Sequence, residues 1–287
     1  MRTAPLLLCI GCVSVLIVHI HYSSCHSSAP HPVVFLSGVS FQSTSTTSHG
    51  PLEELLHSPY PCEQVFLDIG SNIGNHVRFL FESHLFPEAP YPAHIARHFN
   101  KHTVKNTCAV GFEANPTHWP YLDQLSKAYN RKGWTTLFLH TAVSDREGFM
   151  KFYRQGDEQD REWGFTMHDT PGSKRVSVLV PTVDIAAWMR AYIRPTHTVL
   201  VKMDIEGSEY PVMSRLLAGA LSILCSSVKV ITIEYHPSRA PRAFENRTVY
   251  FHDMVNRRLR RSNPTCQTVL VQMDDESYYN DTVALPI

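Results

Sequence analysis

The sequence predicts an α/β protein with a doubly wound, mostly parallel β-sheet. Short apolar runs alternate with segments of helical periodicity from about residue 65 to residue 272, which is the pattern of successive βαβ units. The apolar runs are nearly continuous, as expected for strands that are buried on both faces of a sheet. Hydrophobic residues make up 43% of the 287 residues and charged residues 18%, so the chain has enough apolar side chains to form a core.

Six segments are expected to be core strands, because each is a short apolar run bounded by polar or turn-forming residues. They span residues 65–69, 109–113, 136–143, 198–204, 228–234 and 268–272. Residues 150–154 and 176–180 differ from these core strands, because valines alternate with other residues in the second segment. We therefore expect an antiparallel excursion there.

Four segments are expected to be helices, because apolar residues recur in them at intervals of three or four positions. They span residues 75–83, 119–129, 185–193 and 210–221. Asp184 directly precedes the third of these helices and is a candidate N-cap, and Pro195 follows the end of that helix. A helix between consecutive strands supplies the crossover that a parallel sheet requires.

The N-terminus predicts export of the rest of the chain. Arg2 precedes an apolar run at residues 5–20, and the next Lys or Arg is Arg78, a distribution that favours a cytoplasmic N-terminus. The apolar run is shorter than the ~20 residues of a typical membrane span and slightly longer than the apolar part of most signal peptides. Residues 1–22 are therefore expected to be either a signal peptide or a type II membrane anchor, which places the protein in the Golgi or ER lumen, membrane-anchored, or makes it secreted.

The segment that follows is rich in Ser, Thr, His and Pro and nearly free of charge. This composition is typical of a flexible stalk, expected at residues 23–55. One folded domain is expected at residues 56–287. Lys and Arg together number 26, as do Asp and Glu, so the formal net charge of zero argues against nucleic-acid binding through a basic face.

Four of the cysteines fall in the expected domain: Cys62, Cys108, Cys225 and Cys266. An even number is compatible with two disulfides without requiring them. Cys62 lies six residues before Asp68, and Cys108 lies five before Glu113, so both thiols are expected near the amino ends of two strands. We therefore consider a Cys62–Cys108 disulfide if the domain is lumenal and the two strands are neighbours.

Polar and acidic residues follow the expected strands. They form the clusters DIGSNIG (68–74), EANP (113–116), AVSD (142–145), DIEGSE (204–209) and EYH (234–236). Ligands of doubly wound sheets bind beyond the carboxyl ends of the strands, so these clusters define the candidate site. The glycines of the first cluster let a ligand approach the backbone, and Glu113 is placed to accept hydrogen bonds from two ribose hydroxyls.

The first cluster is not a phosphate-binding loop. It lacks the third glycine of the dinucleotide fingerprint and the Gly-Lys-Ser/Thr of a P-loop. An acidic rim suits a cationic nucleoside instead, and S-adenosylmethionine is a nucleoside that carries a sulfonium. Asp68 would then orient its amino-acid part, directly or through water, and Glu113 its ribose.

At this point the sequence resembles the FkbM-type S-adenosylmethionine-dependent methyltransferases. The matching elements occur in the family's order as LDIGSNIGNH (67–76), FEANP (112–116), AVSD (142–145), VPTVDIAAWM (180–189), VKMDIEGSEY (201–210) and IEYH (233–236). The resemblance covers roughly residues 60–240 and implies a class I methyltransferase fold, of the Rossmann-like type, with S-adenosyl-L-methionine as methyl donor. The residues of these motifs that are candidates for cofactor binding are Asp68, Gly70, Ser71, Asn72, Gly74, Glu113, Asn115, Ser144 and Asp145.

One departure from the usual spacing is a His- and Pro-rich segment after the first helix. Glu113 follows Asp68 by 45 residues, whereas the corresponding acidic residue of a nucleotide-binding unit follows the glycine loop by ~20 residues. We interpret the extra length, about residues 83–107, as an insertion over the cofactor or substrate mouth. Its histidines His94, His98 and His102 have a spacing that suits zinc, but we favour an exposed polar helix face.

Methyl transfer from a sulfonium is an in-line displacement that depends on positioning, and a general base should accelerate attack by a hydroxyl by ~10²–10⁴. Asp204 and His236 are candidates for this base by position, and histidine has a suitable unperturbed pKa. Glu206 either joins them or complements a helix dipole. Lys202 is expected to have a structural role. Carboxylate clusters also suit Mg²⁺, but we expect no metal.

The expected function is therefore O-methylation of a glycan or another small molecule in the secretory pathway, with membrane attachment through the N-terminal segment. A catalytically inactive nucleoside-binding module on the same fold is the alternative. A dinucleotide-dependent oxidoreductase is disfavoured by the spacing of the glycines. Binding of S-adenosylmethionine without turnover would favour the inactive module.

Overall fold

The computed structural model describes residues 62–99, 106–153, 165, 177–239, 244 and 247–274. The chain divides into two compact units, Met1–His31 and Pro32–Ile287, and all described residues belong to the second. The expected N-terminal segment and stalk, residues 1–22 and 23–55, lie outside the described residues. Among the helices that the structure describes, none combines the length and the apolar character needed to span a bilayer.

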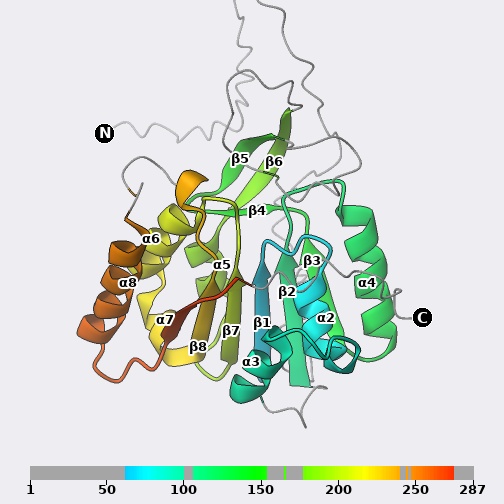
Figure 1. The fold of residues 1–287 in the computed structure, drawn as a ribbon, viewed down its shortest axis with the longest axis horizontal. Helices are drawn as coiled ribbons and strands as arrows, with labels where there is room; N and C mark the ends of the chain where they lie inside the picture. The colour runs from blue at the N-terminus through cyan, green and yellow to red at the C-terminus, as the bar shows by residue number, and fades with distance from the viewer. Residues whose placement is uncertain are drawn as a thin grey trace, which may run out of the picture. The chain divides into compact units, whose positions relative to one another are not determined.

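A six-stranded parallel sheet forms the centre of the second unit (Figure 1). Its strands are β1 (Gln64–Ile69), β2 (Thr107–Phe112), β3 (Thr135–Leu139), β7 (Thr198–Met203), β8 (Val228–Ile233) and β9 (Val269–Gln272). They lie in the order β3-β2-β1-β7-β8-β9, and every neighbouring pair is parallel. This order reverses direction between β1 and β7, as in doubly wound nucleotide-binding folds, and it confirms the predicted fold class.

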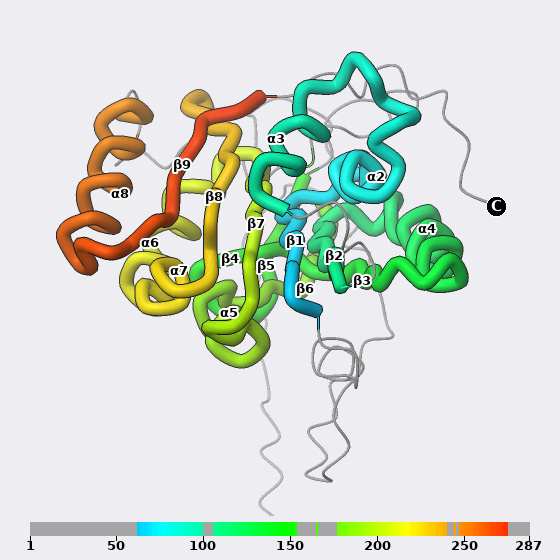
Figure 2. The backbone as a smooth tube through the Cα atoms, turned by 90° about the horizontal axis from the view of Figure 1, so that it is seen from below, coloured from blue at the N-terminus to red at the C-terminus, as the bar shows by residue number. Residues whose placement is uncertain are grey.

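Helices cover both faces of this sheet (Figure 2). On one face lie α2 (Asn75–Phe81), α3 (Tyr91–His98) and α4 (Trp119–Arg131). On the other lie α5 (Ile185–Tyr192), α6 (Glu209–Gly219), α7 (Leu221–Ser227) and α8 (Thr248–Ser262). Every residue of β1 is buried. Phe66 packs in the apolar cluster on the side of α2, α3 and α4, and Val65 and Leu67 pack in the cluster on the side of α5 to α8. This alternation follows from the two-residue period of a strand.

A smaller sheet contains three strands, β4 (Ala142–Ser144), β5 (Gly148–Tyr153) and β6 (Ser177–Asp184), in the order β4-β6-β5. The antiparallel pairing of β5 with β6 confirms the predicted excursion. The single strand expected at residues 136–143 is corrected here, because the chain bends at His140 and Thr141 and splits it into β3 and β4 of different sheets. Figure 1 shows the small sheet beyond one end of the larger one.

Helix α5 begins where the sequence predicts it. The Asp184 carboxylate accepts hydrogen bonds from the backbone N–H groups of Ala186 and Ala187, at 3.0 and 3.2 Å, and so caps the helix N-terminus. The same carboxylate binds the Arg215 guanidinium, which connects α5 to α6. The side-chain hydrogen bonds from Arg215 hold the pKa of Asp184 below its usual value.

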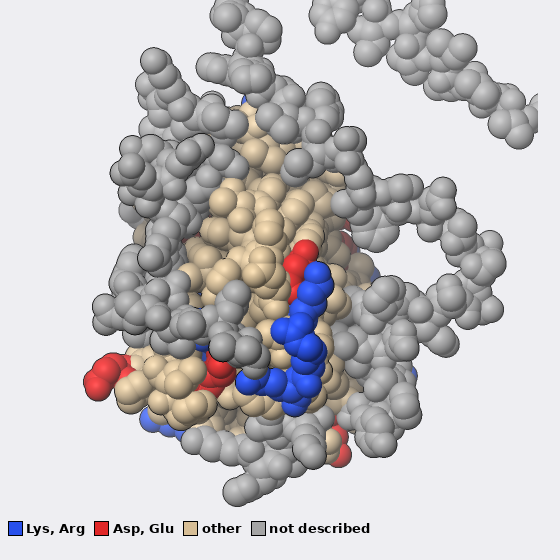
Figure 3. All heavy atoms as spheres, turned by 90° about the vertical axis from the view of Figure 1, so that its right-hand side faces the viewer, with Lys and Arg blue, Asp and Glu red and all other residues tan. Residues whose placement is uncertain are grey.

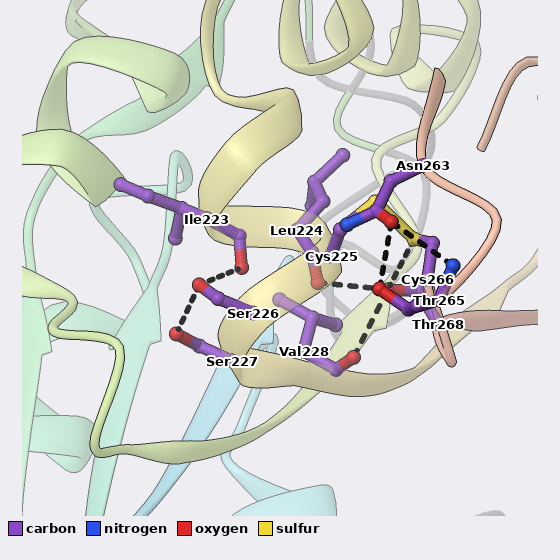
Figure 4. Close-up of a disulfide and its surroundings, with 10 residues drawn as sticks. All are labelled: Ile223, Leu224, Cys225, Ser226, Ser227, Val228, Asn263, Thr265, Cys266 and Thr268. Atoms are coloured by element: carbon purple, nitrogen blue, oxygen red, sulfur yellow. Dashed lines mark hydrogen bonds between the residues drawn. A yellow bond between two sulfur atoms is a disulfide. The ribbon is translucent and has the colours of Figure 1, made fainter. Parts of the chain in front are cut away.

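Two disulfides connect segments that are distant in sequence. Cys62–Cys108 joins the chain just before β1 to the neighbouring strand β2, with a Cα–Cα distance of 5.7 Å, and confirms the pairing considered from the sequence. Cys225–Cys266 joins α7 to the segment that leads into β9 (Figure 4). Beside it, the Thr268 hydroxyl contacts the carbonyl oxygens of Leu224 and Val228, at 2.7 and 3.0 Å.

A buried polar trio lies between α2 and α4. The Arg78 guanidinium donates to the Glu82 carboxylate at 3.0 Å, and the Tyr129 hydroxyl donates to the same carboxylate oxygen at 2.6 Å. The Arg78 side chain has no exposed surface and lies over the Phe86 ring. Burial opposes the charge of Arg78, but the surrounding groups, Tyr129 and Glu82 among them, raise its pKa above the usual value.

The described surface offers no broad basic face on the side shown in Figure 3, where Lys and Arg form a narrow band beside a few acidic residues. The arginines Arg257, Arg258, Arg260 and Arg261 are exposed along α8, as expected of a solvated helix face. His94 is buried and His98 is half-buried on α3, with ring centroids 5.1 Å apart. The exposed polar face expected for these histidines is therefore corrected for His94 and His98, and His102 lies outside the described residues.

Candidate functional site

The loop after β1 is held in a conformation that favours glycine. Gly70 and Gly74 have φ angles of 83° and 81°, and Asn72 has a φ of 51°, all in the left-handed region. A Cβ atom on Gly70 would overlap the carbonyl oxygen of Asp204 at the end of the adjacent strand β7. A Cβ atom on Gly74 would lie 2.8 Å from Leu125 of α4. The two glycines therefore let the loop pack closely against its neighbours.

Glu113 ties this loop to the loop after β2. One of its carboxylate oxygens accepts a hydrogen bond from the backbone N–H of Asn72 at 2.6 Å, and the other accepts one from the N–H of Asn115 at 2.7 Å. The side chain is 8% exposed. A carboxylate offers about four acceptor positions, so two bonds to the backbone leave Glu113 able to accept further hydrogen bonds from a ligand.

Lys202 holds the ends of β1 and β7 together. Its ammonium donates to the carbonyl oxygen of Gly70 at 2.6 Å and lies 3.4 Å from the carboxylate of Asp204 and 3.8 Å from that of Asp68. Burial opposes the charge of this ammonium, but the carboxylates of Asp204 and Asp68 raise the pKa of Lys202 above its usual value. Lys202 thus has the structural role expected from the sequence.

Asp68 lies beneath the loop rather than at the surface. Its side chain has no exposed area, and the Ser71 hydroxyl donates to its backbone carbonyl oxygen at 3.0 Å. Burial raises the pKa of Asp68 to about 6, although the nearby Lys202 ammonium opposes this shift. Direct contact of Asp68 with a ligand would need the loop to move. This position therefore agrees better with the alternative in which Asp68 orients the ligand through a water molecule.

A cavity opens at the carboxyl ends of β1, β2 and β7, the edge at which doubly wound sheets bind ligands. One part of its lining is apolar and is formed by Phe112, Ala114, Ala142, Val143, Phe152 and Phe165. The other part is polar and includes Asn72, Glu113, His118, Asp204, Glu206 and Ser208. The rings of Phe152 and Phe165 stack in parallel with centroids 5.1 Å apart, so the apolar part has a flat aromatic wall.

Four carboxylates surround His236 after β8. Its Nδ1 lies 3.0 Å from Glu209, and its Nε2 lies 3.3 Å from Glu234, 3.5 Å from Glu206 and 3.8 Å from Asp204. Burial opposes protonation, but the hydrogen bonds to Glu209 and Glu234 and the charges of the carboxylates raise the pKa of His236 to about 10. At neutral pH the ring is an imidazolium with no free lone pair. This state disfavours the expected role of His236 as general base.

Glu209 organises the loop after β7. Its carboxylate accepts hydrogen bonds from the backbone N–H groups of Ile205 and Gly207, at 3.0 and 3.1–3.2 Å. Gly207 has a φ of 105°, and a Cβ there would overlap the backbone of Arg239. Glu206, also in the left-handed region with a φ of 56°, pairs with the Arg239 guanidinium.

In the part of the chain that the structure describes, one group of side chains lies close enough to hold a metal ion, namely Asp204, Glu209 and His236. These carboxylates already face protein cations, because Asp204 lies beside Lys202 and Glu209 beside His236. The Glu209 carboxylate also accepts hydrogen bonds from backbone N–H groups. Asp204 and Glu209 therefore each have a cationic neighbour within the chain.

A second, smaller cavity lies beside the first. Its lining includes His76 of α2, Tyr91 of α3, Lys202, Asp204, Thr232 and Glu234. The hydroxyl groups of Tyr91 and Thr232 are hydrogen-bonded at 2.6 Å. Asp204 lines both cavities and so marks the place where they approach each other.

The structure separates the predicted site residues into groups. Gly70, Asn72, Glu113, Asp204 and Glu206 line the larger cavity. The remaining predicted residues support the loops or lie beyond the lining, and these are Asp68, Ser71, Gly74, Asn115, Ser144, Asp145 and His236. The Ser144 hydroxyl donates to the Asp145 carboxylate at 3.1 Å. The residues of β4 that reach the cavity are the preceding ones, Ala142 and Val143.

Sequence reasoning missed several lining residues. Phe152 and Phe165 had no local signal, because their position depends on how the small sheet folds over the large one. His118 belongs to the turn before α4 and follows the EANP motif by two residues. Glu234 was visible as a strand-end carboxylate in EYH, but nothing in the sequence distinguished it from the other acidic residues.

The charge of His236 predicts how stability depends on pH. A raised pKa in the folded state means that the stabilisation is complete below the ordinary pKa of 6.5 and is lost as the pH rises through about 10. We expect the difference in unfolding free energy between the wild type and His236→Gln to shrink from pH 7 to pH 10, as measured by urea denaturation. A difference that stays constant over this range would show that His236 is not held as an imidazolium.

A known protein family matches much of this chain. The family model described as the methyltransferase FkbM domain matches residues 68–262. Among solved structures, the crystal structure of methyltransferase FkbM from Methylobacillus flagellatus KT is similar at 13% identity and a TM-score of 0.32. That match covers 55% of this chain, which spans only 30% of the length of the other protein. No curated protein matches this chain significantly.

Proposed function

Because the chain belongs to the FkbM methyltransferase family, we propose that it transfers a methyl group from S-adenosylmethionine to a hydroxyl oxygen of a glycan or another small molecule. The observation that carries this proposal is the larger cavity, which combines an acidic part with a flat apolar part at the point where the strand order reverses. Ligands of doubly wound sheets bind at this point.

The residues of the cavity suit the parts of S-adenosylmethionine, which supplies the methyl group to be transferred. Glu113 retains acceptor positions for ribose hydroxyls, and the wall formed by Phe152 and Phe165 suits a flat base. Asp204 and Glu206 place negative charge where a sulfonium would be stabilised. The chain's own contribution is to bind, align and exclude water from the reacting groups.

The same charges favour a neutral acceptor. Asp204 lines both cavities and Glu234 lines the smaller one, so a carboxylate or phosphate at the reacting end of the acceptor would meet two carboxylates. A hydroxyl group instead finds hydrogen-bond acceptors. This supports a hydroxyl-bearing molecule, such as a sugar, over an anionic acceptor.

We place the enzyme in the secretory pathway, attached to the membrane or secreted. Two disulfides support this location, since disulfides persist in oxidising compartments. The uncharged apolar run after Arg2 supports it from the sequence.

The proposed function is tested by incubating the protein with S-adenosylmethionine labelled in the methyl group and with a panel of glycosides and glycolipids. We expect label to appear in a neutral acceptor and in no phosphorylated or carboxylated analogue. Binding of S-adenosylmethionine without transfer to any acceptor would favour an inactive nucleoside-binding module.

Removal of the Glu113 carboxylate should weaken cofactor binding. A Glu113→Ala variant is expected to lose about 1–3 kcal/mol of binding free energy for S-adenosylmethionine, since ribose hydroxyls would lose their acceptor. The loss of the bond to Asn72 adds to this effect by releasing the loop after β1. Isothermal titration calorimetry measures the change, with Asp253→Asn on the exposed side of α8 as control. Equal affinity of Glu113→Ala and wild type would mean that the ribose binds elsewhere.

A further inference from the structure

The methyl acceptor must lose a proton, and most of the ionisable groups near Asp204 are already engaged. Asp204 lies beside the Lys202 ammonium, and Glu206 pairs with Arg239. Glu209 has no exposed side-chain area and accepts hydrogen bonds from the backbone. His236 is an imidazolium. Each of these four groups therefore already has a charged or backbone partner within the chain.

Glu234 differs from these groups in its surroundings. It lies directly after β8 and lines the smaller cavity together with Asp204. Its carboxylate lies 3.3 Å from the Nε2 of His236, a nitrogen that also lies near the carboxylates of Asp204 and Glu206. Its side chain is 22% exposed, so it can reach a molecule that occupies the cavity.

The smaller cavity has the size of a subsite rather than of a complete binding site. Its space for the centres of water-sized molecules is about 10 Å³, which is about what one water molecule needs. Only the hydroxyl group at the reacting end of an acceptor would enter it. Since Asp204 lines both cavities, a group in the smaller cavity approaches a donor in the larger one from the side of Glu234.

We propose that the smaller cavity receives the acceptor hydroxyl and that Glu234 is the catalytic base that takes its proton. This inference rests on the proposed methyltransferase function. In the step, a bond forms between the acceptor oxygen and the methyl carbon while the bond between that carbon and the donor sulfur breaks. The sulfonium becomes a neutral thioether, and the hydroxyl proton moves to the Glu234 carboxylate, so no oxidant or reductant is needed.

The surroundings of Glu234 support this role. Burial raises the pKa of Glu234, as do the charges of Asp204 and Asp274, while His236 acts in the opposite direction. A carboxylate with a pKa moved toward neutrality is a stronger base than an ordinary one. The Lys202 ammonium lies 3.4 Å from Asp204, whereas Glu234 pairs with the His236 ring. The two carboxylates thus have different environments, an arrangement typical of separate roles.

The test uses two donor analogues and therefore needs no known acceptor. S-adenosylhomocysteine lacks the methyl group, and sinefungin carries an ammonium group at the position of the methyl. If Glu234 faces that position, wild-type protein should bind sinefungin more tightly, and Glu234→Gln should reduce this preference on the order of tenfold, by loss of one nearby charge. Glu234→Asp should keep most of the preference, and Asp253→Asn should keep all of it.

The outcomes are distinguishable by calorimetry. If wild-type protein binds neither analogue, the proposed function fails. If both analogues bind and Glu234→Gln leaves the preference for sinefungin unchanged, the function stands and the assignment of Glu234 is overturned. Should Glu234→Gln not fold, Glu234→Ala and Glu234→Asp give the same comparison, with the affinity for S-adenosylhomocysteine showing whether the site is intact. Once an acceptor that the wild-type protein methylates is known, kcat of Glu234→Gln for that acceptor should be lower than the wild-type value by ~10²–10⁴.

Discussion

A Glu82→Ala variant is expected to lose about 3–5 kcal/mol of unfolding free energy, because breaking a buried ion pair leaves an uncompensated charge. The Arg78 guanidinium has no exposed surface and donates to Glu82 at 3.0 Å. The Tyr129 hydroxyl also donates to Glu82, at 2.6 Å, and would lose its acceptor. This trio joins α2, which follows the cofactor loop, to α4.

Urea denaturation measures the effect, and a triple variant provides the control. Replacing all three groups together, as Arg78→Met, Glu82→Leu and Tyr129→Phe, removes the charge and both donors, so it should cost much less than Glu82→Ala alone. A loss below about 1 kcal/mol for Glu82→Ala would show that the ion pair is not buried as described.

Reduction of the Cys62–Cys108 disulfide is expected to lower the unfolding free energy by about 4 kcal/mol, from the loop-closure entropy of the unfolded chain. The two cysteines are 46 residues apart in sequence. The bond joins the starts of β1 and β2, the strands whose carboxyl ends carry the cofactor loops. Its loss should therefore also weaken ligand binding when the protein is close to unfolding.

Two double variants isolate the two disulfides. Of the two described disulfides, Cys225→Ala with Cys266→Ala retains the Cys62–Cys108 bond, so the effect of reductant on this variant measures the contribution of that bond. The complementary variant, Cys62→Ala with Cys108→Ala, measures the second bond, whose sequence separation of 41 predicts a similar loss of about 4 kcal/mol. Detection of free Cys62 and Cys108 thiols by mass spectrometry of the unreduced protein would contradict the pairing.

Much of the fold could be predicted from apolar runs, because strands buried on both faces have a strong local pattern. The strand at residues 228–234 was predicted to within one residue of β8. The split of residues 136–143 into β3 and β4 was not predicted. Both halves are partly apolar, and the bend at His140 and Thr141 depends on contacts with the small sheet, such as the bond from the Thr141 hydroxyl to the Pro181 carbonyl.

The position of the site could be predicted from the sequence, but the roles of its individual residues could not. Strand-end carboxylates such as Glu113 and Asp204 were expected at one edge of the sheet, and the parallel register brings them there. Their division into anchors and exposed ligands was not predictable, since it depends on three-dimensional partners. His236 illustrates this, because a histidine with an ordinary pKa would be a suitable base, and only the four carboxylates around it make it a cation.

The charges at the sheet edge provide a physical reason for the binding of a sulfonium nucleoside. Calorimetric titration of the wild-type protein with S-adenosylmethionine and, separately, with NAD tests this account most directly. We predict one S-adenosylmethionine bound per chain and no measurable binding of NAD, since the glycine loop lacks the pyrophosphate-binding spacing. Binding of NAD without binding of S-adenosylmethionine would contradict the assignment of the cavity.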